Sequence, residues 1–283
     1  METVLATHAG FCFGVDKAVR NVYELAEKTT GKIYTYGPII HNDSVVEDLA
    51  KRGINVINSE NELSDIYDST IVIRAHGVPE RIYELIKKNN NTCVDGTCPV
   101  VKRIHDIVRE KSSEGFRIII IGSHAHPEVL GVMGWVIGDA RVIENADEAN
   151  AFIHDSSDPI CIVSQTTFNL NKFQELVEII KNKGYNVNVV NTICNATKER
   201  QESADIIASK VDVMLVIGGR NSSNTQKLYA ICKEKCPNTY FVSGVDDLDI
   251  DIPKTASLVG ITAGASTPNK IIEEVQNYVR INF

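Results

Sequence analysis

The sequence predicts an α/β fold made of three pseudo-equivalent α/β units, each with a small, mainly parallel sheet. Short continuous apolar runs alternate with helical patterns along the chain, which is typical of parallel strands buried between helices. One local design also occurs three times, because Cys12, Cys98 and Cys194 each stand between an extended run and a helical segment. The expected units span 13–97, 98–193, and 194–283 together with 1–12.

The elements of the first unit follow from hydrophobic periodicity and from breakers. Apolar residues recur on one face from Val15 to Lys28, which predicts a helix directly after Cys12. A second helix, over 44–52, ends at Gly53. The other elements expected are strands at 33–36, 54–57, 70–73 and 92–94 and a helix at 80–88.

The other two units repeat this order of strands and helices. In the second unit we expect helices at 100–114, 146–152 and 170–183 and strands at 118–121, 141–143, 160–163 and 187–190. In the third unit we expect helices at 197–209, 225–235 and 269–279 and strands at 213–217, 240–242 and 257–260. One strand is missing at the end of the third unit, and the apolar run 3–6 at the N-terminus is predicted to supply it.

Composition narrows the class of protein. Apolar residues make up 43% of the 283 residues and charged residues 23%, as in soluble globular proteins. The net charge of −8 argues against general nucleic-acid binding. No apolar run approaches about 20 residues and no secretory signal is visible, so neither a membrane span nor export is expected. In a cytoplasmic protein the seven cysteines stay reduced, and spaced cysteines then point to metal binding or catalysis.

The three cysteines before helices are candidate metal ligands. A helix N-terminus favours a thiolate, and three thiolates can hold an iron–sulfur cluster, or zinc with a fourth ligand. A 4Fe–4S cluster held by three cysteines would leave one iron open to a substrate oxygen. The alternative is that all three are small buried apolar residues. The roles of the other four stay open, although a surface or packing role is favoured over metal binding for the last two: Cys93, Cys161, Cys232 and Cys236.

Polar residues gather in the loops that follow the predicted strands, where open α/β sheets bind ligands. Imidazoles, hydroxyls and amides in such loops suit a phosphate or diphosphate. The candidates are His41, His76, His126, Ser222, Ser223, Asn224 and Ser266. Ser222 could equally cap the helix that follows it. Glu128 could relay protons, or it could be a glutamate in the first turn of a helix, where the helix dipole stabilises its charge. Thr166 could join the proton relay or cap a helix.

Nine short segments, taken in order, resemble the 4-hydroxy-3-methylbut-2-enyl diphosphate reductases, the LytB/IspH family. They are FCFGV at 11–15, GPIIHN at 37–42, RAHGV at 74–78, TCP at 97–99, HPEV at 126–129, SQTT at 164–167, TICNAT at 192–197, NSSNT at 221–225 and TAGASTP at 262–268. The resemblance covers nearly the whole chain. It implies a trefoil of three α/β units around a 4Fe–4S cluster, and the last step of the non-mevalonate isoprenoid pathway.

The resemblance also implies roles for the candidate residues. Cys12, Cys98 and Cys194 would hold the cluster, whose fourth iron would bind the substrate hydroxyl. Glu128 would relay protons for a two-electron reductive dehydroxylation that yields isopentenyl and dimethylallyl diphosphates. Thr166 would orient the hydroxyl or a water, and His126 would serve both the relay and the substrate. The histidine, serine and asparagine candidates would hold the diphosphate. Electrons would come from an external donor such as ferredoxin or flavodoxin.

Two readings from other classes remain open. One is a zinc protein in which three thiolates and a histidine form a structural site. The other is a sensor that binds a phosphate ligand without turning it over. Positions around the site, such as Phe13 and Trp135, are expected to tolerate variation or to tune access.

Overall fold

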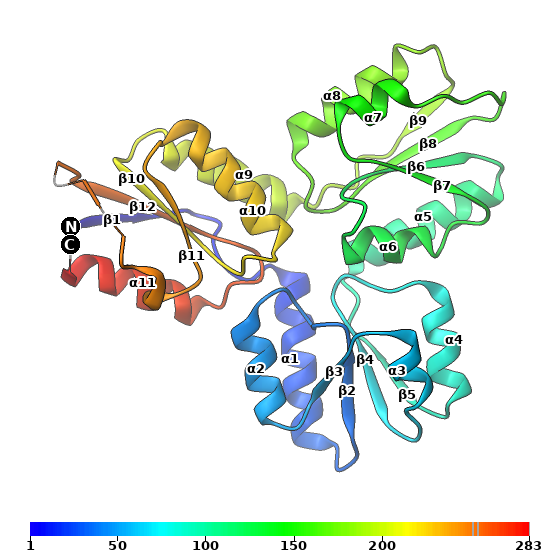
Figure 1. Ribbon diagram of the computed structural model, residues 1–283, viewed down its shortest axis with the longest axis horizontal. Coiled ribbons are helices and arrows are strands. Elements are labelled where there is room, and N and C mark those ends of the chain that lie inside the picture. The colour runs from blue at the N-terminus through cyan, green and yellow to red at the C-terminus, as the bar shows by residue number, and fades with distance from the viewer. Residues whose placement is uncertain (251, 254, 283) are drawn as a thin grey trace. The chain divides into compact units, whose positions relative to one another are not determined.

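The computed structural model describes residues 1–250, 252, 253 and 255–282. It contains three four-stranded sheets whose strand pairings are parallel (Figure 1). Strands and helices alternate along the chain, which confirms the predicted α/β class. None of the helices in this described part combines the length and apolarity that a membrane span requires.

The chain divides into two compact units. The terminal unit comprises 1–16, 41–45 and 194–283, and the middle unit comprises 17–40 and 46–193. The three expected unit boundaries, the trefoil and its central cluster therefore stay predictions. Position 283, where the third expected unit ends, lies outside the described residues.

The first sheet of the middle unit has the strand order β3-β2-β4-β5. Its strands are β2 (Ile33–Tyr36), β3 (Asn55–Ile57), β4 (Thr70–Ile73) and β5 (Thr92–Asp95). The helices of this part are α1 (Phe13–Lys28), α2 (Asp43–Lys51), α3 (Glu60–Ser64) and α4 (Glu80–Lys88). Ile82 and Ile86 of α4 lie one turn apart and pack on Ile71 and Ile73 of β4, so the amphipathic face of this helix covers one side of the sheet.

The second sheet of the middle unit has the order β7-β6-β8-β9. Its strands are β6 (Arg117–Ile121), β7 (Ala140–Ile143), β8 (Ile160–Ser164) and β9 (Val187–Val189). Its helices are α5 (Pro99–Ser113), α6 (Pro127–Met133), α7 (Ala146–Ala151) and α8 (Leu170–Lys181). Alternate isoleucines of β6 pack against opposite layers, Ile119 and Ile121 toward α7 and α8, and Ile118 and Ile120 toward α5 and α6. A central strand buried on both faces explains this continuous apolar run.

The terminal unit holds the third sheet, in the order β1-β12-β10-β11. Its strands are β1 (Glu2–Leu5), β10 (Val213–Ile217), β11 (Thr239–Val242) and β12 (Leu258–Ala263). Its helices are α9 (Asn195–Ala208), α10 (Ser223–Lys235), α11 (Asn269–Asn282) and the 3-10 turn Val245–Asp247. The N-terminal strand lies beside β12, with Glu2 opposite Leu258. Helix α11 packs on one face of this sheet, and α9 and α10 pack on the other (Figure 1).

Two short helices, α3 and α6, were not expected from the sequence. Helix α6 has seven residues and begins at Pro127, so Glu128 stands in the first turn of a helix, which was one of the two interpretations of this residue. Seven residues give too few turns for a clear hydrophobic period. Helices α9 and α10 also begin two residues earlier than predicted, because Cys194 and Ser222 are their N-caps.

Candidate active site

Glu128 and Thr166 form a buried pair in the middle unit. Glu128 is the second residue of α6 and only 2% exposed, and Thr166 follows β8. The carboxylate accepts two hydrogen bonds of 2.6 Å, one from the backbone N–H of Thr166 to Oε1 and one from the Thr166 hydroxyl to Oε2. Burial raises the pKa of Glu128 to about 7, although the Thr166 bonds oppose this shift. A carboxyl with this pKa can gain and lose a proton at neutral pH.

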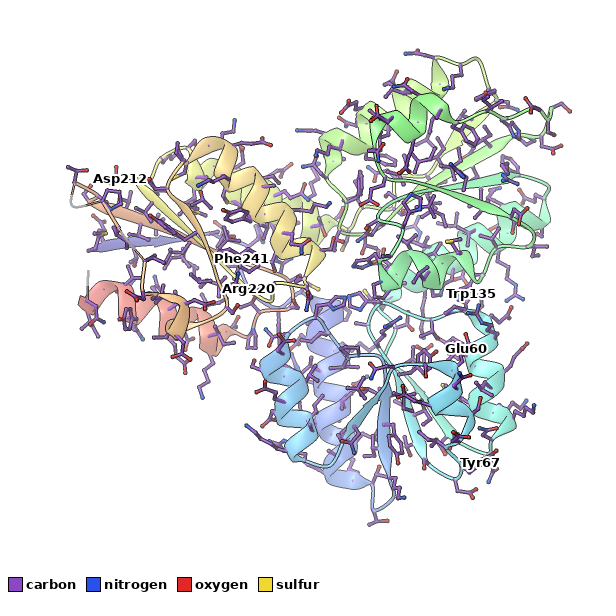
Figure 2. All side chains as sticks on the ribbon, in the orientation of Figure 1. Glu60, Tyr67, Trp135, Asp212, Arg220 and Phe241 are labelled. Carbon is purple, nitrogen blue, oxygen red and sulfur yellow. The ribbon has the colours of Figure 1, made fainter. Side chains whose placement is uncertain are left out.

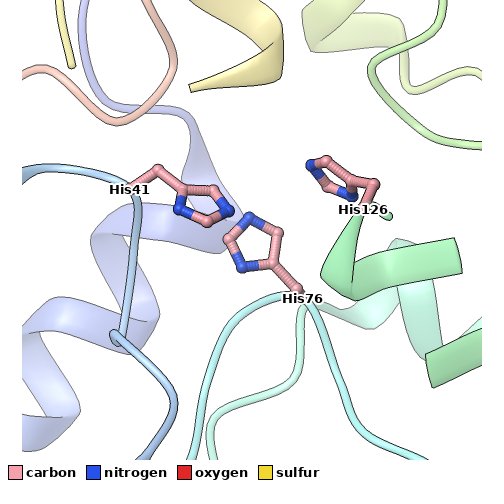
Figure 3. A group of neighbouring side chains, drawn as sticks. All are labelled: His41, His76 and His126. Atoms are coloured by element: carbon pink, nitrogen blue, oxygen red, sulfur yellow. The ribbon is translucent and has the colours of Figure 1, made fainter. Parts of the chain in front are cut away.

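The N-cap of α6 is His126, whose ring is held by the helix that it caps. Its Nδ1 accepts a hydrogen bond of 3.2 Å from the Glu128 backbone N–H. With Nδ1 used as an acceptor, the proton of the neutral ring lies on Nε2, which makes that nitrogen a donor. The ring of His76 stands edge-on to it, with 5.4 Å between the centroids and 83° between the planes (Figure 3). Two imidazoles from different loops thus form one polar group in the middle unit.

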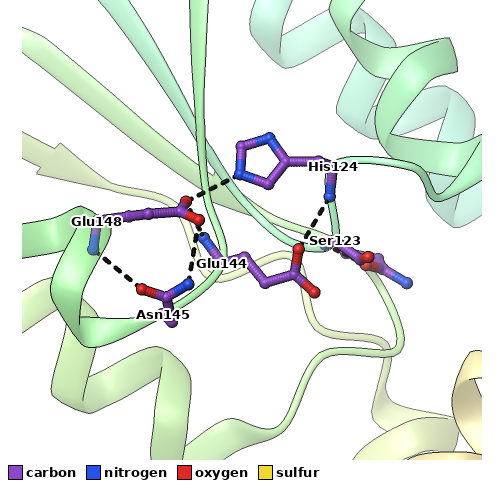
Figure 4. Close-up of polar contacts among 6 residues, drawn as sticks. Ser123, His124, Glu144, Asn145 and Glu148 are labelled. Atoms are coloured by element: carbon purple, nitrogen blue, oxygen red, sulfur yellow. Dashed lines mark hydrogen bonds and ion pairs between the residues drawn. The ribbon is translucent and has the colours of Figure 1, made fainter.

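The loop that leads to His126 is anchored on both sides. The Ser123 N–H donates to Gln165 Oε1 at 3.1 Å, and the Gln165 amide donates to Thr167 Oγ1 at 2.8 Å. On the other side, the His124 N–H donates to Glu144 Oε2 at 3.2 Å (Figure 4). The His124 ring lies 2.9 Å from Glu148 Oε2.

Gln165 therefore connects the loop before His126 with the loop that contains Thr166. Sequence reasoning gave it no role, although it lies within the SQTT segment beside Thr166.

A second polar group lies in the terminal unit, at the N-terminus of α10. Ser222 caps the helix, because its hydroxyl accepts the Thr225 N–H at 3.4 Å. The Ser266 hydroxyl donates to the His41 carbonyl at 3.1 Å and lies 3.4 Å from Ser222 Oγ. Ser223 is the first residue of the helix. The structure thus brings these candidates together and supports both readings of Ser222, as a cap and as part of a polar cluster.

Asn224 is the most informative residue of this group. It is 4% exposed, and neither atom of its side-chain amide has a hydrogen-bond partner among the described residues. Burying an amide without partners costs about 1–3 kcal/mol, so such groups in native proteins usually serve a ligand or an ordered water. A side chain at Gly264 would place its Cβ 2.0 Å from Thr225 Oγ1, so glycine is required for the loop after β12 to approach α10.

The three candidate cysteines form no disulfide and are of intermediate burial, and each stands at a helix N-terminus. Cys98 caps α5 in the middle unit, and Cys194 caps α9 in the terminal unit. Cys12 immediately precedes α1, and its N–H donates to the Ala265 carbonyl at 3.2 Å. Burial raises the pKa of the Cys194 thiol, and backbone N–H groups of Ala196 and Thr197 act in the opposite direction.

A buried arginine supports the two cysteines of the terminal unit. Arg200, on α9, is 5% exposed and interacts electrostatically with Cys12 and Cys194. Its guanidinium donates to the Gly10 carbonyl at 2.6 Å and to the Ala196 carbonyl at 2.7 Å. It therefore connects the loop before Cys12 to the helix after Cys194. Arg200 does not stand out in the sequence, because it lies in a charged stretch that resembles an exposed helix face.

The remaining four cysteines and His105 are not members of these polar groups. Cys161, Cys232 and Cys236 are packed in apolar cores, whereas Cys93 lies on β5 and is exposed. Burial raises the pKa of Cys161 to about 11 and that of Cys232 to about 12, so these thiols stay protonated at neutral pH. His105 is buried in α5, and burial lowers its pKa to about 4.

A family model and several relatives match nearly the entire chain. The model described as LytB protein matches residues 3–280. A protein of Caldanaerobacter subterraneus subsp. tengcongensis is 43% identical over 276 residues, covering 97% of this chain and 95% of its own length. One of Clostridioides difficile is 41% identical over 279 residues, covering 99% of each chain. Both relatives are named 4-hydroxy-3-methylbut-2-enyl diphosphate reductase.

Two solved structures share the fold. The first is described as the E-1-hydroxy-2-methyl-but-2-enyl-4-diphosphate reductase from Plasmodium falciparum, with a TM-score of 0.92 and 30% identity, covering 99% of this chain and 87% of that one. The second structure is described as the terminal enzyme of the non-mevalonate pathway, with a TM-score of 0.71, 40% identity and 99% coverage of both chains.

The fold and these matches define an oxidoreductase of the α/β class, as the sequence predicted. The chain belongs to the LytB family.

Proposed function

We propose that the chain reduces 4-hydroxy-3-methylbut-2-enyl diphosphate to isopentenyl and dimethylallyl diphosphates. The observation that carries this proposal is the match over nearly the full length to reductases named for this substrate. In the reaction, two electrons and two protons enter, the C–O bond of the allylic alcohol breaks, a C–H bond forms and the hydroxyl leaves as water. The electrons come from an external donor of the ferredoxin or flavodoxin type.

The residues present fit a 4Fe–4S cluster held by Cys12, Cys98 and Cys194. None of the three cysteines forms a disulfide, and all three are of intermediate burial. Each lies at a helix N-terminus, where the helix dipole favours a negatively charged group such as a cluster held by thiolates. The positive charge of Arg200, which interacts electrostatically with Cys12 and Cys194, also favours an anionic group beside them. When bound, the cluster would supply the electrons and, at the iron that no cysteine holds, a Lewis acid for the substrate hydroxyl.

The diphosphate is assigned to the two polar groups. In the terminal unit, Asn224 offers an unpartnered buried amide at the N-terminus of α10, where backbone N–H groups and the helix dipole favour an anion. His41, Ser222, Ser223 and Ser266 belong to the same group. In the middle unit, His76 and His126 add imidazole donors. These assignments follow the chemistry of the side chains and the resemblance of their segments to the family.

Glu128 is assigned to proton delivery and Thr166 to the orientation of the substrate hydroxyl or a water. The carboxyl has a pKa near neutrality, so it can be protonated before turnover and give up that proton during it. The 2.6 Å bond from the Thr166 hydroxyl makes a short path by which a proton could leave the buried acid. The His126 ring accepts a hydrogen bond from the Glu128 N–H, and this histidine could take part in the same proton relay as Glu128.

The test is anaerobic purification followed by assays of iron, inorganic sulfide and zinc, and by turnover of the allylic diphosphate with a strong reductant. The proposal expects a brown protein whose cluster absorption fades in air and which forms both product diphosphates. A colourless protein with stoichiometric zinc would support the structural zinc reading. A brown protein that binds but never consumes the substrate would support the sensor reading.

A further inference from the structure

Trp135, the only tryptophan of the chain, follows α6 (Figure 2). Its side chain contacts residues of several other segments. Its indole Nε1 donates to the carbonyl of Val78, in the loop after β4, at 2.9 Å. Its ring stacks on His105 of α5 with 5.0 Å between the centroids and 13° between the planes. The ring of Tyr83 on α4 lies edge-on at 6.0 Å. Trp135 thus joins the end of α6 to the loop 74–79, which contains His76.

The backbones of these two segments also lie close together. A Cβ at Gly131 would lie 3.4 Å from the backbone of Gly77 and from Val78 N. A Cβ at Gly134 would lie 2.3 Å from Pro79 Cβ and 2.7 Å from Pro79 Cα. Residues 77–79 therefore pack directly on the side of α6 that lacks side chains.

Arg109 covers the outer side of the indole. Its guanidinium carbon is 5.4 Å from the Trp135 ring centroid, which is a cation–π distance. The same guanidinium makes two hydrogen bonds to the Glu80 carboxylate, of 2.6 and 3.0 Å, at the start of α4. The contacts around Trp135 thus hold its orientation from more than one side, as a role in positioning other residues requires.

We propose that Trp135 is a positioning residue that holds the loop of His76 against the helix that carries His126 and Glu128. This inference rests on the proposed function, in which the two histidines bind the substrate diphosphate. The N-cap of α6 is His126, and His76 immediately precedes the segment that Trp135 binds. Loosening the contact between Trp135 and Val78 would let the two imidazoles move apart and would weaken their combined hold on an anion.

The first test compares Trp135→Phe with Tyr185→Phe. Each change keeps an aromatic ring and removes one hydrogen bond to the backbone, because the Tyr185 hydroxyl accepts the His154 N–H at 3.2 Å. Tyr185 packs on the opposite face of the second sheet from α6, so its loss should cost stability without affecting the histidines. We expect KM for the allylic diphosphate to rise roughly tenfold in Trp135→Phe, with a smaller change in kcat, and to stay unchanged in Tyr185→Phe. Equal KM values in the two variants would overturn the inference.

The second test uses Gly134→Ala and a binding measurement that needs no turnover. Gly134 has φ −71° and ψ −2°, which alanine adopts freely, so the effect of the added methyl is its collision with Pro79. Titration with inorganic diphosphate, followed by the fluorescence of Trp135, should shift the emission of the wild type and require roughly tenfold more diphosphate in the variant. Identical titration curves, or no emission change on saturation, would refute the role of Trp135.

This titration separates the two proposals. If the wild-type protein fails to consume the allylic diphosphate, the proposed function is wrong, whereas the diphosphate titration still decides whether Trp135 couples to an anion site. If turnover is normal and both Trp135→Phe and Gly134→Ala leave KM unchanged, only the positioning role is wrong.

Discussion

Replacing Glu128 by glutamine should make the folded protein more stable at alkaline pH. The wild-type carboxyl is buried and has its pKa raised from 4.5 to about 7. Between these two pH values the folded protein keeps a proton that the unfolded chain has released. Stability therefore falls as pH rises through this window, and the full penalty is present above pH 7. Glutamine does not ionise, so the variant does not lose this unfolding free energy as the pH rises.

The size of the effect follows from the shift in pKa. A rise from 4.5 to about 7 corresponds to about 3 kcal/mol, at about 1.4 kcal/mol per pH unit. The glutamine oxygen can still accept the Thr166 N–H, and its amide can donate to the Thr166 hydroxyl, so both local hydrogen bonds are kept. We expect the difference in unfolding free energy between Glu128→Gln and wild type to grow by about 3 kcal/mol from pH 4.5 to about pH 8.

The measurement is anaerobic denaturant unfolding of both proteins at a series of pH values. Glu148→Gln is a control, because the pKa of Glu148 is shifted in the opposite direction from that of Glu128. Burial raises the pKa of Glu148, but hydrogen bonds from the Glu144 N–H and from His124 outweigh it and lower that pKa overall. That variant should be less stable than wild type at neutral pH, with a difference that shrinks on acidification. A pH-independent difference for Glu128→Gln would show that the carboxyl is not buried as an acid of raised pKa. The same variant should keep its cluster and lose most turnover.

Three further predictions concern the cluster and the terminal unit. Cys98→Ser should lose most of its iron, and full iron content with normal turnover would remove Cys98 as a ligand. Arg200→Met removes a buried positive charge beside Cys12 and Cys194, so the midpoint potential of the bound cluster should become more negative in a redox titration. Arg200→Lys should restore part of the wild-type potential. An unchanged potential in Arg200→Met would rule out an electrostatic role for Arg200. Deleting residues 1–5 removes β1 and the partners of its backbone groups on β12, at about 1 kcal/mol each. The thermal midpoint should then drop sharply, and a native midpoint would show that the strand is dispensable.

The strands could be predicted well because buried parallel strands consist of continuous apolar residues, which are visible in the sequence. The run 118–121 is four isoleucines, all of them buried, as a central parallel strand requires. Helix ends were less accurate, because their position depends on capping. The predicted helices began at 197 and 225, whereas the N-cap positions are occupied by Cys194 and Ser222, so the helices begin at 195 and 223.

The proximity of Glu128 and Thr166 could not be read from composition or periodicity, since 38 residues separate them. It follows from sheet topology instead. Strands β6 and β8 are parallel neighbours, and Ile121 at the end of one pairs with Ser164 at the end of the other. Residues after both strands therefore start from the same edge of the sheet. The sequence indicates which polar residues follow predicted strands. It does not indicate which strands are neighbours in the sheet, and only the structure shows that pairing.

The residues that support the site escaped prediction for a different physical reason. A residue that binds substrate or metal has its type dictated by that chemistry, so it stands out in a sequence. Arg200 and Trp135 instead donate to the backbone carbonyls of Gly10 and Val78. Every residue offers such a carbonyl, so the acceptor leaves no trace in the sequence, and Gly10 lies 190 positions from its donor. A change at Trp135 was expected either to be harmless or to tune access to the site, and the proposed positioning role favours the second outcome.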